Sequence, residues 1–285
     1  METLAKGFGL LEGPVWDPAR GLLFADAEYG GVHCLAPDGA VQLVIPHRRG
    51  IGGMVRHENG GLVVSGRNVA YKGPEAAPTL VLLDNDPAQG IVGFNDITTD
   101  AAGRIYAGSL GFYPTKKGDT PRPGALHLVD LDGSVRLLAT GVQLTNGIGF
   151  SPDERFLYHS DSGDQTVYLY DVLADGGVSN RRPFARISEG LPDGVATARD
   201  GSVWVAVAHG GIVIVLESDG RVRERIAFPV PMVTSLCFGG DDLRDLYVVS
   251  GSEGVPSGRA GSIFRLRCDV PGLPVAPARV KLEPS

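Results

Sequence analysis

The chain has 285 residues and a formal net charge of −7, and it contains 41 glycines and 20 prolines. Turn-forming residues at that density exclude a coiled coil, and a hydrophobic share of 43% excludes a disordered chain. No apolar run approaches the roughly 20 residues of a membrane span, and an acidic balance without a basic block argues against a nucleic-acid partner.

The N-terminus, Met1 to Lys6, lacks the basic-then-apolar pattern of a secretion signal, so we expect a cytoplasmic protein. Three cysteines, Cys34, Cys237 and Cys268, are far apart in the chain and form no CxxC pair. This spacing argues against a disulfide framework and against a structural zinc site. We expect neither a membrane nor a nucleic acid as a partner, and a monomer or a weak homodimer in solution.

Short β-rich runs separated by tight turns follow one another along the chain. Three such runs are Gly61 to Val64, Arg104 to Ala107 and Ser202 to Ala206. Runs of this kind on either side of an Asp-Gly or Asn-Gly turn are typical of β-hairpins. The clearest turns, in chain order, are Asp38-Gly39, Asn59-Gly60-Gly61, Ala102-Gly103, Asp132-Gly133, Asp200-Gly201 and Asp219-Gly220.

Six similar segments open successive units of this pattern, at intervals of roughly 40–50 residues. The segments begin at Glu12, Gly52, Asn95, Asn146, Asp193 and Thr234. About four strands per unit at this period predict an all-β fold, a six-bladed β-propeller with four-stranded blades, as a single domain over residues 1–285. A β-sandwich is the alternative, but it gives no reason for a repeated opening.

Three stretches fall outside the regular units. The third unit is lengthened between Gly111 and Gly124 by a proline-rich insertion, which we expect to be a surface loop near a binding face. Leu4 to Leu10 and Ala278 to Leu282 are strand-like. We expect these two stretches to complete one blade together, so that both termini close the ring and leave no open edge.

The first residues of the six opening segments are expected to form a ring around the central channel. Four of these residues, Glu12, Asn95, Asn146 and Asp193, carry carboxylates or carboxamides. Charged side chains are rarely buried unless they are paired or bind a metal. Acidic and amide oxygens that converge without a cationic partner are what a hard divalent cation requires.

Each of these residues has a simpler interpretation when it is taken alone. Asn146 and Asp193 each precede a glycine, as in common turn dipeptides. Glu12 is compatible with a solvated loop, and Asn95 with a side chain that caps a strand end. Their shared position in the repeat nevertheless favours a common metal site.

Other polar residues are weaker candidates. Asp96 follows Asn95 directly, so its side chain is expected to point the other way and to act on the site indirectly. Asp26 and Asp161 follow apolar strands and are expected to bind backbone amides between strands. His209 precedes two glycines and is expected to reach the mouth of the channel, where it contacts the substrate.

Several catalytic motifs are missing from the sequence. The histidines show no H-x-x-x-H spacing, which argues against a zinc-hydrolase helix. No G-x-S-x-G elbow, P-loop or dinucleotide fingerprint is found either, which argues against an α/β-hydrolase and a cofactor-dependent dehydrogenase.

Four of the opening segments and one further motif resemble the gluconolactonase, regucalcin (senescence marker protein) and luciferin-regenerating-enzyme family. The resemblance follows the chain in order and covers nearly all of it. The motifs are Leu11-Glu12-Gly13-Pro14-Val15-Trp16, Phe94-Asn95-Asp96, Thr145-Asn146-Gly147-Ile148-Gly149-Phe150-Ser151-Pro152-Asp153, Leu191-Pro192-Asp193-Gly194 and Gly261-Ser262-Ile263-Phe264-Arg265-Leu266.

The resemblance implies a six-bladed propeller with one divalent cation at the mouth of the channel. It implies that Glu12, Asn146 and Asp193 are the metal ligands and that Asn95 is a ligand or a substrate contact. It also implies that Asp193 acts as the general base in lactone hydrolysis. We expect calcium in the first place, although an all-oxygen ligand set also accepts zinc, magnesium or manganese.

One position departs from the family pattern. Sugar-lactone members often carry an arginine two residues before the asparagine matched by Asn95, and this chain has Gly93 there. A smaller or more apolar lactone therefore becomes a plausible substrate. Phe112 and Tyr113 in the insertion are expected to supply apolar walls for it.

The expected function is that of a metal-dependent lactonase, a hydrolase in which the cation polarises the carbonyl of a cyclic ester. Two alternatives remain at this point. The same site is compatible with a metal-assisted lyase or isomerase, and a propeller is equally compatible with a non-catalytic calcium-binding or ligand-binding protein.

Overall fold

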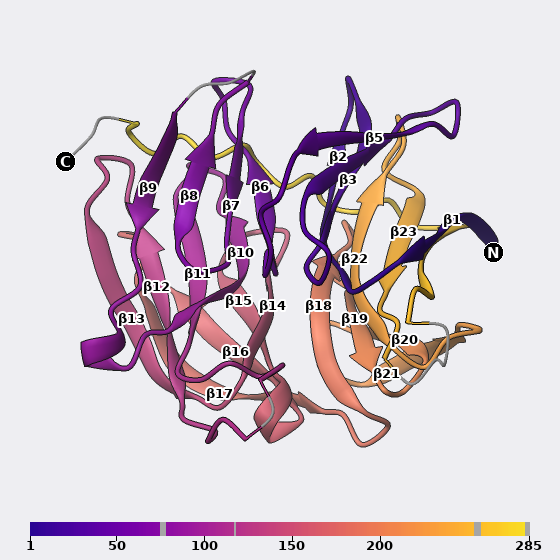
Figure 1. Cartoon of the computed structure of the whole chain (residues 1–285). Helices are drawn as coiled ribbons and strands as arrows, with labels where there is room; N and C mark the ends of the chain where they lie inside the picture. The colour runs from indigo at the N-terminus through magenta and orange to yellow at the C-terminus, as the bar shows by residue number, and fades with distance from the viewer. Residues whose placement is uncertain (75–77, 117, 254–257, 283–285) are drawn as a thin grey trace.

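The computed structural model describes residues 1–74, 78–116, 118–253 and 258–282. Within these residues, 24 strands form six four-stranded antiparallel sheets arranged around a common axis (Figure 1). The prediction of a six-bladed β-propeller is therefore confirmed. Among the residues that the structure describes, no helix is both long and apolar enough to cross a membrane.

Each of the first three blades follows the chain from the axis outward. The first consists of β2 (Leu11–Asp17), β3 (Gly21–Asp26), β4 (Val32–Leu35) and β5 (Val41–Ile45). The second consists of β6 (Met54–Arg56), β7 (Leu62–Val64), β8 (Val69–Lys72) and β9 (Thr79–Leu83). The third consists of β10 (Gly93–Thr99), β11 (Ile105–Leu110), β12 (Gly124–Val129) and β13 (Val135–Val142), and it is preceded by the 3-10 helix η1 (Pro87–Gln89).

The fourth and fifth blades repeat this order, whereas the sixth draws on both ends of the chain. The fourth consists of β14 (Thr145–Phe150), β15 (Phe156–Asp161), β16 (Thr166–Val172) and β17 (Val178–Arg186), with the 3-10 helix η2 (Ser162–Asp164) after β15. The fifth consists of β18 (Leu191–Thr197), β19 (Val203–Ala208), β20 (Ile212–Leu216) and β21 (Val222–Ala227). The sixth consists of β22 (Val233–Gly239), β23 (Asp245–Ser250), β24 (Gly261–Arg267) and, outermost, β1 (Glu2–Phe8).

Apolar side chains between adjacent blades form the core. All residues of β19 are buried, whereas most of those in the outer strand β21 are exposed. Aromatic pairs join neighbouring blades: Tyr106 meets Phe150 edge-on at 4.9 Å between ring centroids, and Trp204 meets Phe238 at 5.4 Å. Such contacts hold the blades in a fixed ring.

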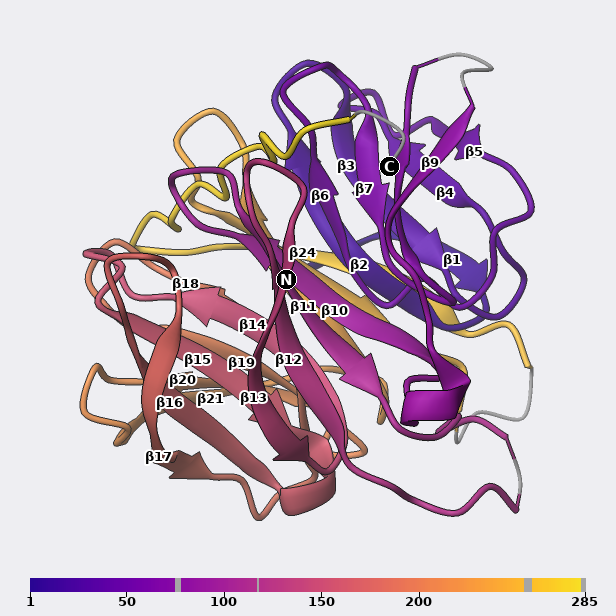
Figure 2. The same ribbon diagram turned by 90° about the vertical axis from the view of Figure 1, so that its left-hand side faces the viewer.

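The way in which the ring closes was predicted only in part from the sequence. The N-terminal stretch forms β1 and pairs with β24, so one blade does contain both ends of the chain. Ala278 to Leu282, however, adds no strand to it. This segment crosses the end of the propeller at which the innermost strands finish, at the top of Figures 1 and 2. There the backbone nitrogen of Ala278 donates to Arg56 O. Pro274 and Pro277 just before it lack the amide hydrogens that a paired strand needs.

Candidate metal centre

The innermost strands of the blades begin at one end of the propeller, and all of them except β6 are irregular near their start. In β10, β14 and β18 the pairing with the next strand skips two residues, a β-bulge. The skipped pairs are Asn95-Asp96, Asn146-Gly147 and Asp193-Gly194. The side chains of Asn95 and Asp96 have different partners, in line with the expectation that they point apart. Asn95 donates to Asn146, whereas Asp96 accepts from the backbone nitrogen of Ile97 and lines the cavity further along the channel.

Glycine allows the backbones of adjacent blades to meet at the axis. A Cβ atom on Gly147 would lie 2.3 Å from the nitrogen of Val195 and 2.5 Å from the carbonyl oxygen of Asp193. A side chain at position 147 would clash at that separation. The glycine therefore lets the backbone of β14 beside Asn146 approach the backbone of β18 beside Asp193. The two candidate ligands are thereby placed side by side.

A chain of side-chain hydrogen bonds links three of the inner strands. Asn95 Nδ2 donates to the carbonyl oxygen of Thr145 at 2.8 Å and to Asn146 Oδ1 at 2.7 Å. Asn146 Nδ2 in turn donates to Ser162 Oγ at 2.8 Å, and the Ser162 hydroxyl donates to the carbonyl oxygen of Pro192 at 2.6 Å. The amide of Asn146 is therefore held from both sides.

Three buried carboxyl groups influence one another electrostatically near the axis. Burial in the surrounding protein, the carboxyl of Asp193 and then that of Asp96 raise the pKa of Glu12 well above its ordinary value. Burial and then Asp96 raise the pKa of Asp193 in the same way. Burial raises the pKa of Asp96 to about 7. Among the ion pairs of the described residues, none involves any of these three groups, so no side-chain cation offsets their charge.

One oxygen in this cluster has no partner. Asp193 Oδ1 is buried and accepts no hydrogen bond, which is costly for a carboxylate unless a cation or a proton compensates. The described residues contain no group of three or more His, Cys, Asp or Glu side chains placed to hold a metal ion. The carboxylates of Glu12 and Asp193 and the carboxamide oxygen of Asn146 are donors of the kind that a hard cation accepts, and their role as ligands stays a prediction.

The other two ring positions have structural roles. The backbone nitrogen of Gly52 donates to Ser65 Oγ at 3.1 Å. Thr234 Oγ1 donates to the carbonyl oxygen of Leu11 at 2.6 Å, which ties the sixth blade to the first. Neither position contributes an oxygen to the candidate metal centre.

The predicted substrate contacts lie on loops at the same end of the propeller. The insertion leaves β11 and returns to β12 at the lower end of Figures 1 and 2. Within it, Phe112 is buried and Tyr113 is exposed, with its hydroxyl donating to Val92 O at 3.3 Å. His209 is exposed after β19, where the chain turns with a φ of 62°. Their contact with a substrate stays a prediction.

The two remaining aspartates bind backbone, as predicted. Asp26 accepts from the amides of Gly9, Glu28 and Tyr29. Asp161 accepts from the amides of Gln143 and Leu144 at the entrance to β14. Both therefore fix the loops from which inner strands begin.

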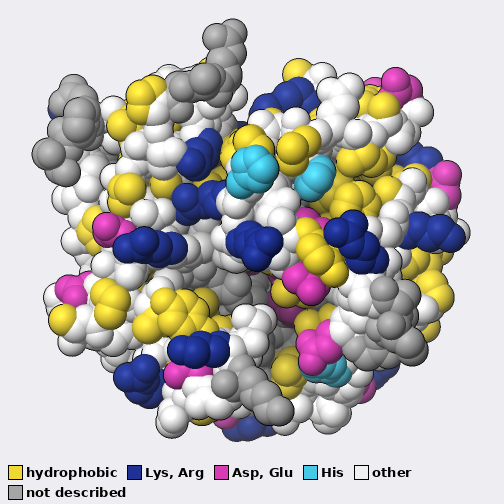
Figure 3. Space-filling view, viewed as in Figure 1, with side chains coloured by type: hydrophobic (Ala, Val, Ile, Leu, Met, Phe, Trp, Pro, Cys, Tyr) yellow, Lys and Arg dark blue, Asp and Glu magenta, His cyan; other side chains and the backbone are white. Residues whose placement is uncertain are grey.

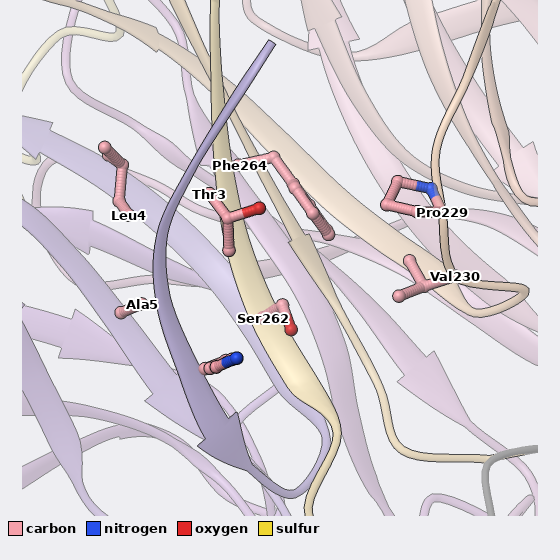
Figure 4. Close-up of a pocket in the computed structure, with 8 residues that line it drawn as sticks. Thr3, Leu4, Ala5, Pro229, Val230, Ser262 and Phe264 are labelled. Atoms are coloured by element: carbon pink, nitrogen blue, oxygen red, sulfur yellow. The ribbon is translucent and has the colours of Figure 1, made fainter.

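The channel continues beyond the candidate metal centre as a cavity of about 950 Å³. Asp96 lines it near the ring, and Leu273 to Pro277 cover its far end. A second hollow of about 390 Å³ lies at the perimeter, between Thr3 to Lys6 of β1, Pro229 and Phe264 (Figure 4). Its lining has no acidic side chain, and on the face drawn in Figure 3 charges of both signs are scattered. Of these two hollows, only the axial cavity adjoins the buried carboxyl groups.

Two residues of this region were not predicted as parts of the candidate metal centre. For Asp96 we expected only an indirect effect on the site, and its charge raises the pKa of Glu12 and Asp193. Ser162 is adjacent to Asp161 in sequence, but only the turn η2 brings its hydroxyl to Asn146. The sequence has no local signal for that contact, because Asn146 is in β14 and Ser162 is in the turn η2, 16 residues further along the chain.

A six-bladed propeller with a converging oxygen cluster at one end of its axis defines the class of this protein. The chain belongs to the SMP-30/gluconolactonase/LRE-like family, whose model matches residues 10–252. The resemblance inferred from the sequence is therefore confirmed.

Proteins of known kind resemble the chain over nearly its whole length. It is 36% identical over 275 residues to a 6-deoxy-6-sulfogluconolactonase of Pseudomonas putida, with 92% of each chain covered. It is 33% identical over 288 residues to the pentonolactonase XacC of Haloferax volcanii, with 95% of each covered. A crystal structure of a calcium-binding protein, regucalcin, from Agrobacterium tumefaciens superposes with a TM-score of 0.84 at 22% identity, covering 97% of this chain and 96% of that one.

Proposed function

We propose that this protein is a metal-dependent lactonase that hydrolyses a sugar-derived lactone to the hydroxy acid. The observation that carries the proposal is the buried, unpartnered Oδ1 of Asp193, which lies beside the carboxyl group of Glu12 and has no cationic side chain to offset it. The names of two relatives, a sulfogluconolactonase and a pentonolactonase, support a lactone of a sugar acid as the substrate class.

Glu12, Asn146 and Asp193 would hold the cation through their side-chain oxygens. When bound there, a divalent cation polarises the ester carbonyl and offsets the negative charge that develops on its oxygen. The calcium-binding description of the regucalcin structure supports calcium as the first ion to test. Zinc, magnesium and manganese accept the same kind of donor set.

In this proposal, side chains of the protein accept the proton of the attacking water and orient the ligands. A water molecule attacks the ester carbon while it transfers one proton to the carboxylate of Asp193, the general base. The ring C–O bond breaks, and the leaving oxygen takes the proton from Asp193 to become a hydroxyl group, which restores the carboxylate. Asn95 keeps Asn146 oriented during this step, and the loops that carry Phe112, Tyr113 and His209 enclose the substrate.

Acid release from a panel of lactones tests the proposal. The panel contains aldonolactones of five and six carbons, a sulfonated gluconolactone and short aliphatic lactones, each measured with and without a chelator. We expect turnover of sugar lactones that stops on chelation and returns with calcium or another divalent ion. A protein that binds metal but opens no lactone contradicts the proposal and favours a lyase, an isomerase or a non-catalytic binding protein.

A further inference from the structure

We propose that Ser162 is a positioning residue of the metal centre: its hydroxyl orients the carboxamide of Asn146 so that the oxygen, not the nitrogen, is presented to the cation. The inference rests on the proposed function, because it concerns the same site. Ser162 is buried in η2 and belongs to neither of the strands that carry the neighbouring ligands.

The direction of the hydrogen-bond chain is fixed by a backbone carbonyl at each end. The carbonyl oxygen of Thr145 can only accept, so the atom of Asn95 that lies 2.8 Å from it must be the nitrogen Nδ2. That nitrogen also donates to Asn146, at 2.7 Å, so the atom of Asn146 that receives the hydrogen must be Oδ1. The nitrogen of Asn146 is then on the far side of its amide group.

The other end of the chain needs Ser162. Asn146 Nδ2 lies 2.8 Å from Ser162 Oγ, which accepts its hydrogen. The hydroxyl must then donate elsewhere, and the carbonyl oxygen of Pro192 receives it at 2.6 Å. A hydroxyl group can accept and donate at once, and a serine here satisfies both neighbours.

The same hydroxyl couples two candidate ligands. Through Asn146 it sets which amide atom faces the axis, and through Pro192 it fixes the backbone just before Asp193. Without the hydroxyl, Asn146 Nδ2 loses its acceptor, and Asn95 alone holds the amide against a 180° rotation that would present hydrogens to the cation. Groups that orient metal ligands typically contribute 10-fold to 100-fold to metal affinity.

Calcium binding by the full-length, chelator-treated protein tests the inference. We expect Ser162→Ala to weaken calcium binding, measured by titration calorimetry with the metal alone, by about 10-fold to 100-fold. Ser160→Ala is the matched control, since Ser160 is equally buried at the end of β15 but its Oγ has no hydrogen-bond partner. The control is expected to keep calcium affinity within about twofold.

A second comparison separates orientation from simple loss of structure. In an Asn146→Asp background either carboxylate oxygen faces the cation, so Ser162→Ala is expected to cost at most a few-fold in calcium affinity there. If Ser162→Ala fails to fold, Ser162→Cys fills the same space with a much weaker hydrogen-bonding group and is expected to weaken calcium binding in the same direction.

The outcomes also separate the two proposals. Wild-type affinity in Ser162→Ala, with the wild type binding calcium, overturns the role of Ser162 and leaves the lactonase proposal intact. An equal loss in the native and Asn146→Asp backgrounds also overturns it, because the effect would not pass through the amide. A wild-type protein that binds none of calcium, magnesium, manganese and zinc overturns the metal centre and the role of Ser162 together.

Discussion

Gly66 and Gly93 meet between the second and third blades, where a Cβ atom on Gly93 would lie 2.9 Å from the carbonyl oxygen of Gly66. That oxygen also accepts the backbone hydrogen bond from Phe94 at 2.7 Å, and Gly66 N donates back to the carbonyl oxygen of Phe94. The absence of the arginine that sugar-lactone relatives often carry here is therefore part of the local backbone packing, and not a change of side chain alone.

Introducing an arginine at position 93 should therefore destabilise the protein, even if its side chain could bind substrate. We expect Gly93→Ala and Gly93→Arg each to lower the free energy of unfolding by about 1–3 kcal/mol, since backbone must shift to admit the Cβ atom. Denaturant unfolding measures this. Gly149→Ala is the control, because a Cβ there would meet only side-chain methyl groups, the nearest at 3.2 Å. A stable Gly93→Arg variant that opens anionic sugar lactones faster would contradict this view.

Removing the proposed general base should separate folding from turnover. Asp193→Asn keeps the shape of the side chain and removes one of three mutually repelling carboxyls, so we expect the metal-free variant to be at least as stable as the wild type. Its lactone turnover at saturating calcium should fall by about 10²–10⁴, the usual contribution of a positioned base. A variant that opens lactones at the wild-type rate would remove Asp193 from the mechanism.

The position of Asp193 on the ring could be predicted from the sequence, because a repeat period fixes which residues face one another across a propeller. Asp96 could not be placed in the same way. The electrostatic effect of Asp96 on Glu12 and Asp193 depends on the inner strands of different blades meeting at the axis, and that convergence is a property of the closed ring. No short segment of the sequence contains it.

The raised pKa values should make the metal-free protein less stable as the pH rises. A carboxyl whose pKa is raised on folding binds its proton more tightly in the folded state, so its stabilising effect is present at low pH and is lost as pH rises. For Asp96, with a folded pKa of about 7, the loss extends up to about neutral pH. Buried histidines act oppositely: burial lowers the pKa of His159 to about 3, so acid destabilises the protein.

A comparison of variants isolates the carboxyl contribution. We expect Asp96→Asn to stabilise the chelator-treated protein relative to the wild type, by an amount that grows between pH 5 and pH 7 by up to about 1.4 kcal/mol per pH unit. Melting temperatures at several pH values measure this difference, in which the histidine contribution cancels. Saturating calcium should reduce it, because the cation offsets the same charge. A difference that stays constant with pH would show that Asp96 does not titrate in this range.

The C-terminal segment shows the limit of a strand-like pattern. Ala278 and Val280 are buried and alternate with exposed Arg279 and Lys281, which is the period of a strand. Alternation reports one buried face, however, and not the edge with which a segment pairs. Here the buried face covers the end of the second blade, where His57 Nε2 contacts the carbonyl oxygen of Val280 at 3.1 Å.

The same segment should stabilise the propeller without taking part in the chemistry. Val280 is 1% exposed and packs in the cluster that contains Val55 and Val63, so we expect Val280→Ala to lower the free energy of unfolding by about 1–3 kcal/mol. Val275→Ala is the matched control, since that side chain is 50% exposed and its loss should change stability by less than about 0.5 kcal/mol. Both variants should open lactones at the wild-type rate below their melting temperatures, because the segment lies at the opposite end of the axis from Glu12. Equal unfolding midpoints for the two variants in urea would mean that burial of Val280 does not stabilise the propeller.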